Sequence, residues 1–76
     1  MVILVEYKKM VQIATEEAEK VGIKFKDIMG KSRSQTVALA RAYAMKRIYT
    51  ELPVSYPEVG YFFRRHHTTV MHAAKK

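Results

Sequence analysis

The scarcity of glycine and proline, and their spacing, most constrain what this chain of 76 residues can fold into. It has three glycines and two prolines, and Gly22, Gly30 and Pro53 divide it into uninterrupted segments. No segment alternates apolar and polar residues as a half-buried strand would. Residues 4–21 instead place apolar side chains at helical spacing: Tyr7, Met10, Val11, Ala14, Ala18 and Val21. We therefore predict an all-α fold.

Breakers and capping residues predict the helices of the first two thirds of the chain. Gly22 is a natural stop for the first helix, in which Glu16 and Lys20 are spaced as an ion pair. Residues 23–29 read as a short connecting turn of helix. A long helix follows over 34–52, with Ser32 or Ser34 as its N-cap and Pro53 as its end.

The C-terminal third predicts two short helices joined by a tight turn. Ser55 and Glu58 have the spacing of a capping box at the start of the first of them. The polar residues 64–66 form the turn, and the last helix begins at about His67. Two short helices in this arrangement indicate a helix-turn-helix.

The size and composition of the chain limit the classes of function. We expect one domain, 1–76, in which 1–30 supply supporting helices and 31–76 carry the long helix and the helix-turn-helix. So short a chain has little room for a large catalytic cleft, and we expect neither enzyme activity nor a cofactor. The lack of cysteine excludes disulfides and cysteine-ligated zinc. The apolar run 1–5 is too short for a signal peptide or a membrane span, so we expect a cytoplasmic protein without a membrane partner.

The positive charge is confined to one part of the chain. The net charge is +7, and residues 1–30 are balanced, with five lysines against five acidic residues. Residues 31–76 carry nine lysines and arginines against two glutamates, which is the whole excess. A cationic half on a neutral scaffold favours a polyanion such as DNA as the partner. A well-solvated basic surface is the alternative interpretation.

The start of the last helix has the side chains that a DNA-reading helix needs. A helix-turn-helix places the N-terminal end of its second helix in the major groove. Here that end presents side chains able to reach base edges, namely His66, His67, Thr68 and Thr69. They follow two cations suited to phosphates, Arg64 and Arg65. Each residue alone could instead cap the helix or bond to its own backbone, so the argument rests on the cluster.

A second basic element enters the long helix. It is the loop Lys31-Ser32-Arg33-Ser34, in which Arg33 is free to enter an A/T-rich minor groove. An exposed loop with an N-cap is the alternative, and spacing does not decide between the two.

The run His67-Thr68-Thr69-Val70-Met71-His72-Ala73 resembles the D-H-T-T-V-x-H-A signature of one bacterial family, the C-terminal DNA-binding domain of the replication initiator DnaA. Upstream, Pro57-Glu58-Val59-Gly60 is similar to the family's L-P-E-I-G. Lys31-Ser32-Arg33-Ser34, followed by Val37-Ala38, is similar to K-x-R-S-x-x-V-A. The resemblance covers about residues 25–76.

The resemblance implies a fold related to the Trp-repressor type of helix-turn-helix. It implies recognition of a DnaA-box-like site, similar to TTATCCACA, by a nucleoid-associated protein. By position, Arg33 is the minor-groove arginine, and His67, Thr68 and Thr69 read the major groove. Phosphate contacts are expected from Lys31, Ser32, Arg41 and the backbone near Ser55.

Three departures from the family pattern stand out. His66 occupies the place of an aspartate that accepts from a cytosine amino group. The turn is shorter than the family's G-G-R-D, and Arg64-Arg65 stands where the family has glycines. Gln35 and Leu39 stand where many members have arginine, which predicts weaker phosphate binding.

Functions other than DNA binding are indicated by fewer residues of the sequence. A protein-interaction module is the second interpretation, in which the apolar run 2–5 and the Tyr- and Phe-rich third helix form a docking surface or a homodimer. Replacing His67 or Thr68 by alanine should abolish DNA binding only under the DNA hypothesis. RNA-binding motifs are lacking, and His67 and His72 are poorly spaced for a metal. There is no phosphate-loop motif and hence no ATP site. The chain is then a stand-alone regulator or competitor at such sites, or a fragment.

Overall fold

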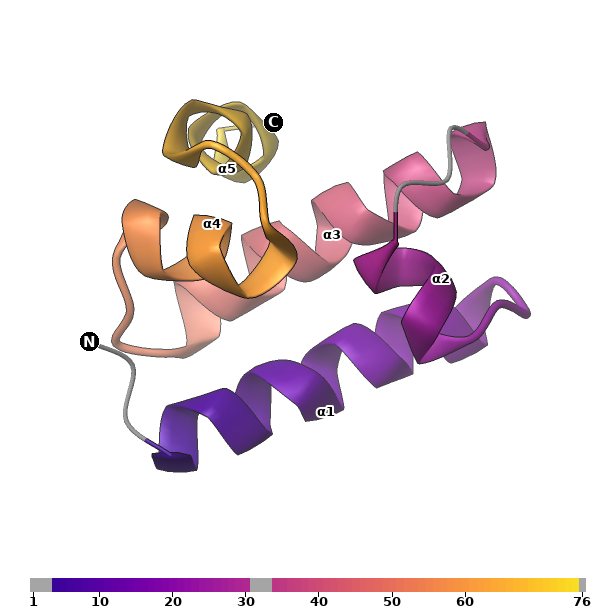
Figure 1. The fold of residues 1–76 in the computed structure, drawn as a ribbon, viewed down its shortest axis with the longest axis horizontal. Helices are drawn as coiled ribbons and strands as arrows, with labels where there is room; N and C mark the ends of the chain where they lie inside the picture. The colour runs from indigo at the N-terminus through magenta and orange to yellow at the C-terminus, as the bar shows by residue number, and fades with distance from the viewer. Residues whose placement is uncertain (1–3, 31–33, 76) are drawn as a thin grey trace.

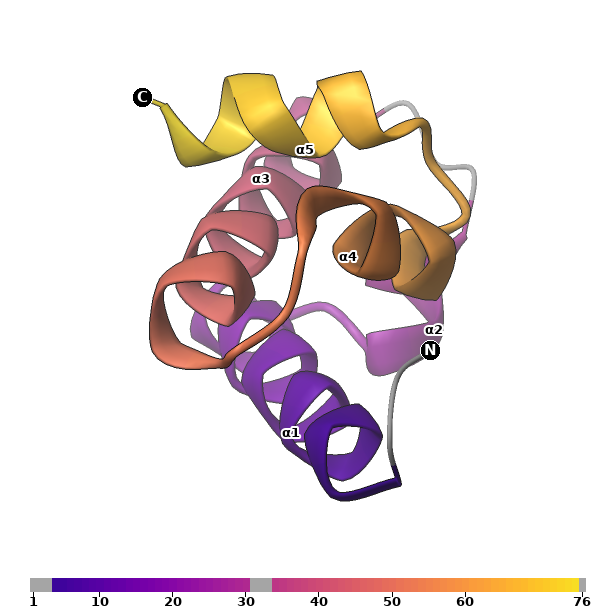
Figure 2. The same ribbon diagram turned by 90° about the vertical axis from the view of Figure 1, so that its left-hand side faces the viewer.

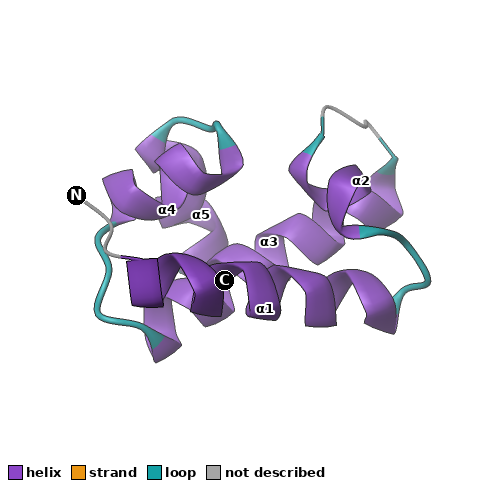
Figure 3. Ribbon diagram, turned by 60° about the horizontal axis from the view of Figure 1, so that its bottom comes forward, coloured by secondary structure: helices purple, strands orange, loops and turns teal. Residues whose placement is uncertain are grey.

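The computed structural model describes residues 4–30 and 34–75, which form five helices. In chain order they are α1 (Leu4–Lys20), α2 (Phe25–Met29), α3 (Gln35–Glu51), α4 (Tyr56–Phe63) and α5 (His67–Ala74). Every regular element in these two stretches is a helix, as Figure 3 shows. The predicted all-α fold is confirmed, and so is the pair of short helices at the C-terminal end.

The long helix α3 is the centre of the arrangement (Figure 1). It packs against α1 and α5, and α2 packs on both α1 and α3. Figure 2 shows α5 lying at the edge of the molecule, above α4. Because α5 packs on α3 and α4 from one side, its other side is left open to a partner.

One hydrophobic core holds these helices, and it draws buried side chains from all five. In the C-terminal pair, Val59 and Phe63 of α4 and Val70 of α5 are completely buried. They contribute the apolar burial that an eight-residue helix needs, since helices this short are marginal without packing. The remaining core residues are Met10, Ile13, Ala14, Ala18, Ile28, Ala40, Ala44, Met45, Ile48, Val54 and Ala73.

The helix ends follow the signals in the sequence. Beyond α1, Gly22 has a φ of 75°, its N–H donates to the Glu19 carbonyl, and the Ile23 N–H donates to the Ala18 carbonyl. This pair of bonds is a Schellman motif, in which a left-handed glycine ends a helix. The predicted stop at Gly22 is confirmed.

The later caps also follow the sequence. The predicted capping box of α4 is confirmed, since the Ser55 N–H donates to the Glu58 carboxylate at 3.0 Å and the Glu58 N–H donates to Ser55 Oγ at 3.4 Å. Ser34 occupies the N-cap position of α3, although its side chain makes no cap hydrogen bond to the first turn. The alternative cap, Ser32, lies outside the described residues.

An ion-pair network joins α1 to α3. Arg47 donates to Glu17 at 2.9 Å and to Glu16 at 3.0 Å, and Lys20 donates to Glu17 at 2.8 Å. The expected pairing of Glu16 with Lys20 is wrong. Packing of α3 against α1 brings Arg47 to Glu16, and Lys20 forms its ion pair with Glu17 instead. No helix in the described stretches is long and apolar enough to cross a lipid bilayer.

The buried carboxylate of this network predicts a pH-dependent stability. Burial raises the pKa of Glu17, but hydrogen bonds from Lys20 and Arg47 outweigh burial and lower it below the ordinary 4.5. A lowered folded-state pKa stabilises the fold above the unfolded-state pKa, and the effect is lost as pH falls through the folded-state value. Glu17→Gln should therefore lower the unfolding free energy at pH 7 by about 1–2 kcal/mol.

Urea unfolding followed by circular dichroism at pH 7 and at about pH 3 checks this prediction. The deficit of the variant should shrink at the lower pH, and a deficit equal at both would contradict it. Glu19→Gln, at an exposed position on α1, is the matched control and should change stability by less than about 0.5 kcal/mol.

Candidate nucleic-acid interface

The turn between α4 and α5 is a second Schellman motif, with arginine in the place of glycine. Arg64 has φ 58° and ψ 44°. Its N–H donates to the Tyr61 carbonyl at 3.2 Å, and the Arg65 N–H donates to the Gly60 carbonyl at 2.8 Å. A side chain in this left-handed conformation costs about 1–2 kcal/mol. The turn therefore holds Arg64 in a strained backbone conformation, which a glycine would adopt without this cost.

Gly60 makes the closure of this turn sterically possible. A Cβ atom at Gly60 would lie 2.6 Å from the Arg65 carbonyl oxygen and 3.4 Å from the His67 backbone nitrogen. Both neighbours are backbone atoms, so they cannot move aside as a flexible side chain would. The start of α5 approaches α4 this closely because residue 60 has no side chain.

Two arginines meet at the carbonyl of Gly30. Arg41 Nη2 donates to this oxygen at 3.0 Å and Arg65 Nη2 at 2.9 Å, while Arg41 Nε donates to the Ile28 carbonyl at 2.9 Å. Burial, together with the positive charge of Arg65, lowers the pKa of Arg41. The shared oxygen joins the end of α2, the middle of α3 and the helix-turn-helix turn, and Gly30 is the residue just before the basic loop.

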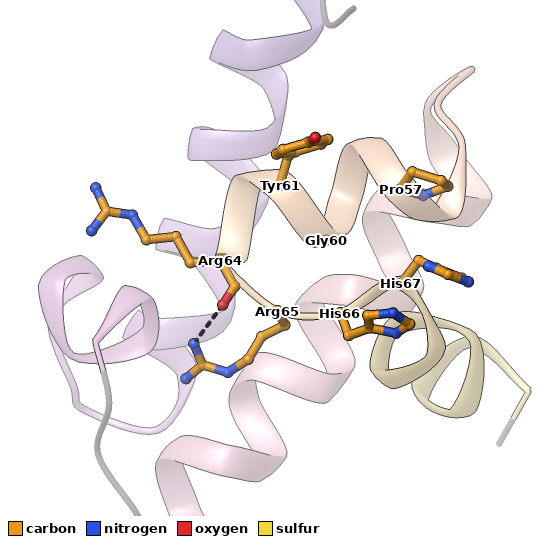
Figure 4. Close-up of a pocket in the computed structure, with 7 residues that line it drawn as sticks. All are labelled: Pro57, Gly60, Tyr61, Arg64, Arg65, His66 and His67. Carbon is orange, nitrogen blue, oxygen red and sulfur yellow. Dashed lines mark hydrogen bonds between the residues drawn. The ribbon is translucent and has the colours of Figure 1, made fainter.

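The N-terminal end of α5 presents an exposed polar face. His66 is the N-cap, with Nδ1 accepting from the Thr68 N–H at 3.3 Å. His66, His67, Thr68 and Thr69 are all exposed, whereas Val70 is buried. Figure 4 shows the rings of His66 and His67 on one side of the turn and the side chains of Arg64 and Arg65 directed to the other. The centroids of the two histidine rings are 4.3 Å apart.

The structure brings most of the predicted site residues together. A groove between α4 and the start of α5 is lined by two of the predicted arginines and both predicted histidines, Arg64, Arg65, His66 and His67 (Figure 4). A second groove, between α3 and α5, is lined by Arg41, Arg65, Thr69 and His72 among others. Among the described residues, no group of three or more His, Asp and Glu side chains is placed to hold a metal ion.

Two further predicted residues, Ser55 and Arg41, already make hydrogen bonds within the fold. Ser55 is exposed at the N-terminal end of α4, where its hydroxyl takes part in the capping box. Lys31, Ser32 and Arg33 lie outside the described residues. Arg41 is only 9 % exposed and bonds to backbone carbonyls, so it links elements of the fold as well as lining a groove. Its phosphate contact stays a prediction.

Two features of this site were not predicted from the sequence: the close approach of the turn at Gly60 and the bond from Arg65 to Gly30. A glycine inside a short amphipathic helix was the available sign of the close approach at Gly60. The bond from Arg65 to Gly30, 35 residues apart, has no sign in the sequence, because a basic residue in a turn is equally compatible with a phosphate contact.

The chain matches the family described as the bacterial dnaA protein helix-turn-helix over residues 10–76. It belongs to this family. The resemblance inferred from the His-Thr-Thr-Val run is thereby confirmed, and the chain is a DnaA-type, DNA-binding helix-turn-helix domain.

Its relatives are chromosomal replication initiator proteins named DnaA. The chain is 45 % identical to that of Leifsonia xyli over 65 residues, which is 84 % of this chain and 14 % of the relative. It is 49 % identical to that of Clavibacter sepedonicus over 51 residues (66 % and 11 %). It is 38 % identical to DnaA 2 of Protochlamydia amoebophila over 58 residues (76 % and 13 %). The matched region is thus about one seventh or less of each relative, and no solved structure matches the chain.

The close contact at Gly60 gives a prediction for this DnaA-type domain. Gly60→Ala should lower the unfolding free energy by about 1–3 kcal/mol, because the new methyl group meets backbone atoms of the turn. It should also weaken DNA binding after correction for the folded fraction, since α5 must shift to relieve the clash.

Gly22→Ala is the matched control for this experiment. Gly22 has a positive φ but open space around its Cβ position, so the substitution strains the backbone without moving α5. Thermal unfolding and DNA titration of both variants separate the two effects. An affinity loss per folded molecule that is equal in both variants would show that the contact at Gly60 does not position the interface.

Proposed function

We propose that this DnaA-type domain binds duplex DNA sequence-specifically at a DnaA-box-like site, with α5 in the major groove. His67, Thr68 and Thr69 contact base edges, and so does His66, the N-cap residue of the same helix. The observation that carries the proposal is the exposure of these four side chains at the N-terminal end of one helix, whose opposite face is anchored by the buried Val70.

The surroundings of α5 support a polyanionic partner. Arg64 and Arg65 flank the helix start, and the helix dipole adds a partial positive charge at the N-terminal end of α5. In the proposed complex Arg64, the exposed member of the pair, contacts a phosphate. Arg65 and Arg41, which already bond within the domain, reach phosphates with their remaining donors. Ser55 donates both its N–H and its hydroxyl to Glu58, so its predicted phosphate contact requires the hydroxyl to turn away from that carboxylate.

The basic loop extends the proposal to the neighbouring minor groove. The predictions that Arg33 enters that groove, and that Lys31 and Ser32 contact phosphates, concern residues outside the described parts of the chain. They stay predictions, supported by the family pattern and by the position of Gly30 beside the turn.

The biological context of the proposal follows from the relatives. They are named chromosomal replication initiators, and the chain corresponds to a small part of each. We propose that it acts on chromosomal sites of the kind that such initiators bind. A homodimer formed through the apolar N-terminal run, and an interaction-module role in general, stay predictions.

The test is fluorescence anisotropy of a labelled duplex carrying a TTATCCACA-type box, against a scrambled duplex, at two salt concentrations. We expect a preference for the box well beyond tenfold, or about 1.4 kcal/mol, that survives the higher salt. His67→Ala should remove this preference, whereas Lys8→Ala, at an exposed position on α1, should keep it. Equal affinity for both duplexes, vanishing with salt, would refute sequence-specific recognition.

The left-handed Arg64 allows charge and backbone effects to be separated. Arg64→Ala should weaken binding to box and scrambled duplexes alike and lower the salt slope by about one unit, with little change in stability. Arg64→Gly should weaken binding equally but raise the unfolding free energy by about 1 kcal/mol, because glycine adopts the left-handed conformation without strain.

Salt titrations of binding and urea unfolding of both variants check this pair of expectations. A changed ratio of box to scrambled affinity in either variant would mean that Arg64 reaches the bases. An unchanged stability in Arg64→Gly would mean that the turn carries no strain.

A further inference from the structure

The hydrogen bonds of His66 define which of its ring nitrogens carries hydrogen. Nδ1 accepts from the Thr68 N–H at 3.3 Å and lies 2.8 Å from Thr68 Oγ1. A nitrogen that accepts a backbone N–H carries no hydrogen itself, so the Thr68 hydroxyl is the donor in the second contact. In a neutral imidazole the hydrogen then resides on Nε2.

The outward edge of His66 is therefore a hydrogen-bond donor only. Its side chain is exposed beside His67, with Nδ1 turned to the helix and Nε2–H left for a partner. In the major groove, guanine offers the acceptors N7 and O6, adenine offers N7 and thymine offers O4. Cytosine offers only its amino group, a donor. A donor facing cytosine leaves both groups unpaired.

We propose that His66 is a specificity-determining residue that rejects cytosine, and favours guanine over it, at the base it faces. The inference rests on the proposed function and adds to it the hydrogen-bonding character of one base. Guanine gives the sharpest contrast with cytosine because it offers two major-groove acceptors to the Nε2–H donor. The cap that holds α5 in place thus also determines the chemistry that His66 presents to DNA.

The proposal is tested by exchanging the donor for an acceptor without losing the cap. His66→Asp keeps a favoured N-cap residue but presents carboxylate oxygens, which accept only. His66→Ser keeps a cap and is too short to reach a base, and circular dichroism of both variants verifies that α5 is retained. Binding of wild type and variants is measured by anisotropy on duplexes in which each position of the site carries each of the four bases in turn.

We expect one position at which wild type binds guanine at least about fivefold tighter than cytosine. At that position His66→Asp should reverse the order and His66→Ser should bind both alike, while preferences elsewhere stay unchanged. Identical base preferences of wild type and His66→Asp at every position would overturn the assignment of His66 while leaving the proposed function intact. Loss of discrimination at all positions in wild type would overturn both.

A measurement on the free domain tests the tautomer independently of DNA. Long-range ¹H–¹⁵N correlation spectra distinguish an imidazole protonated at Nε2 from one protonated at Nδ1. We expect hydrogen on Nε2 of His66. A ring that carries its hydrogen on Nδ1 alone would overturn the inference whatever the binding data show, because its Nε2 would then be an acceptor.

Discussion

The carbonyl oxygen of Gly30 joins the parts of this domain that meet DNA in the proposed function. It accepts from Arg41 of α3 and from Arg65 of the turn before α5. Hydrogen bonds between a charged donor and a carbonyl stabilise by about 1.5–3 kcal/mol each. Two positive charges at one oxygen repel, but each guanidinium has further donors, and Arg41 and Arg65 both use them on other backbone carbonyls. These hydrogen bonds fix the end of α2 relative to the turn before α5, and the basic loop follows Gly30 directly in the sequence.

The turn itself shows how a helix-turn-helix tolerates an unfavourable residue. The chain ends α1 and α4 with the same pair of hydrogen bonds, once around a glycine and once around an arginine. The arginine costs stability, and the buried Phe63 and Val70, with the backbone bond from Arg65 to Gly60, offset that cost. In the proposed complex, a positive charge beside the start of α5 is the gain that accompanies the strained conformation. At residue 64 the arginine therefore lowers stability while it adds positive charge. Gly60 allows the turn to approach α4 closely, because it has no side chain to meet the Arg65 carbonyl oxygen.

Much of this architecture could be predicted from the sequence, because local signals decide it. Gly22 and the Ser55–Glu58 box act over three or four residues, and they mark helix ends where the structure has them. Contacts between distant segments could not be predicted in this way. The partner of Glu16 was misjudged because Arg47 follows it by 31 residues, and packing alone brings them together. The same limit hid the structural role of Arg65, since its residue type suits a phosphate as well as a carbonyl oxygen.

The position of His66 shows why a family pattern is a guide to location more than to chemistry. A cap must accept a hydrogen bond from the first turn of the helix, and aspartate and histidine can both do so. An aspartate that caps still has only acceptors to offer beyond the cap, whereas a histidine that caps through Nδ1 has only a donor. Replacement of one by the other thus conserves the fold of the recognition helix while inverting its outward hydrogen-bonding character. In His66, Nδ1 is committed to the fold by the bond from the Thr68 N–H, and this bond leaves Nε2 as the atom that a base can contact in the proposed complex.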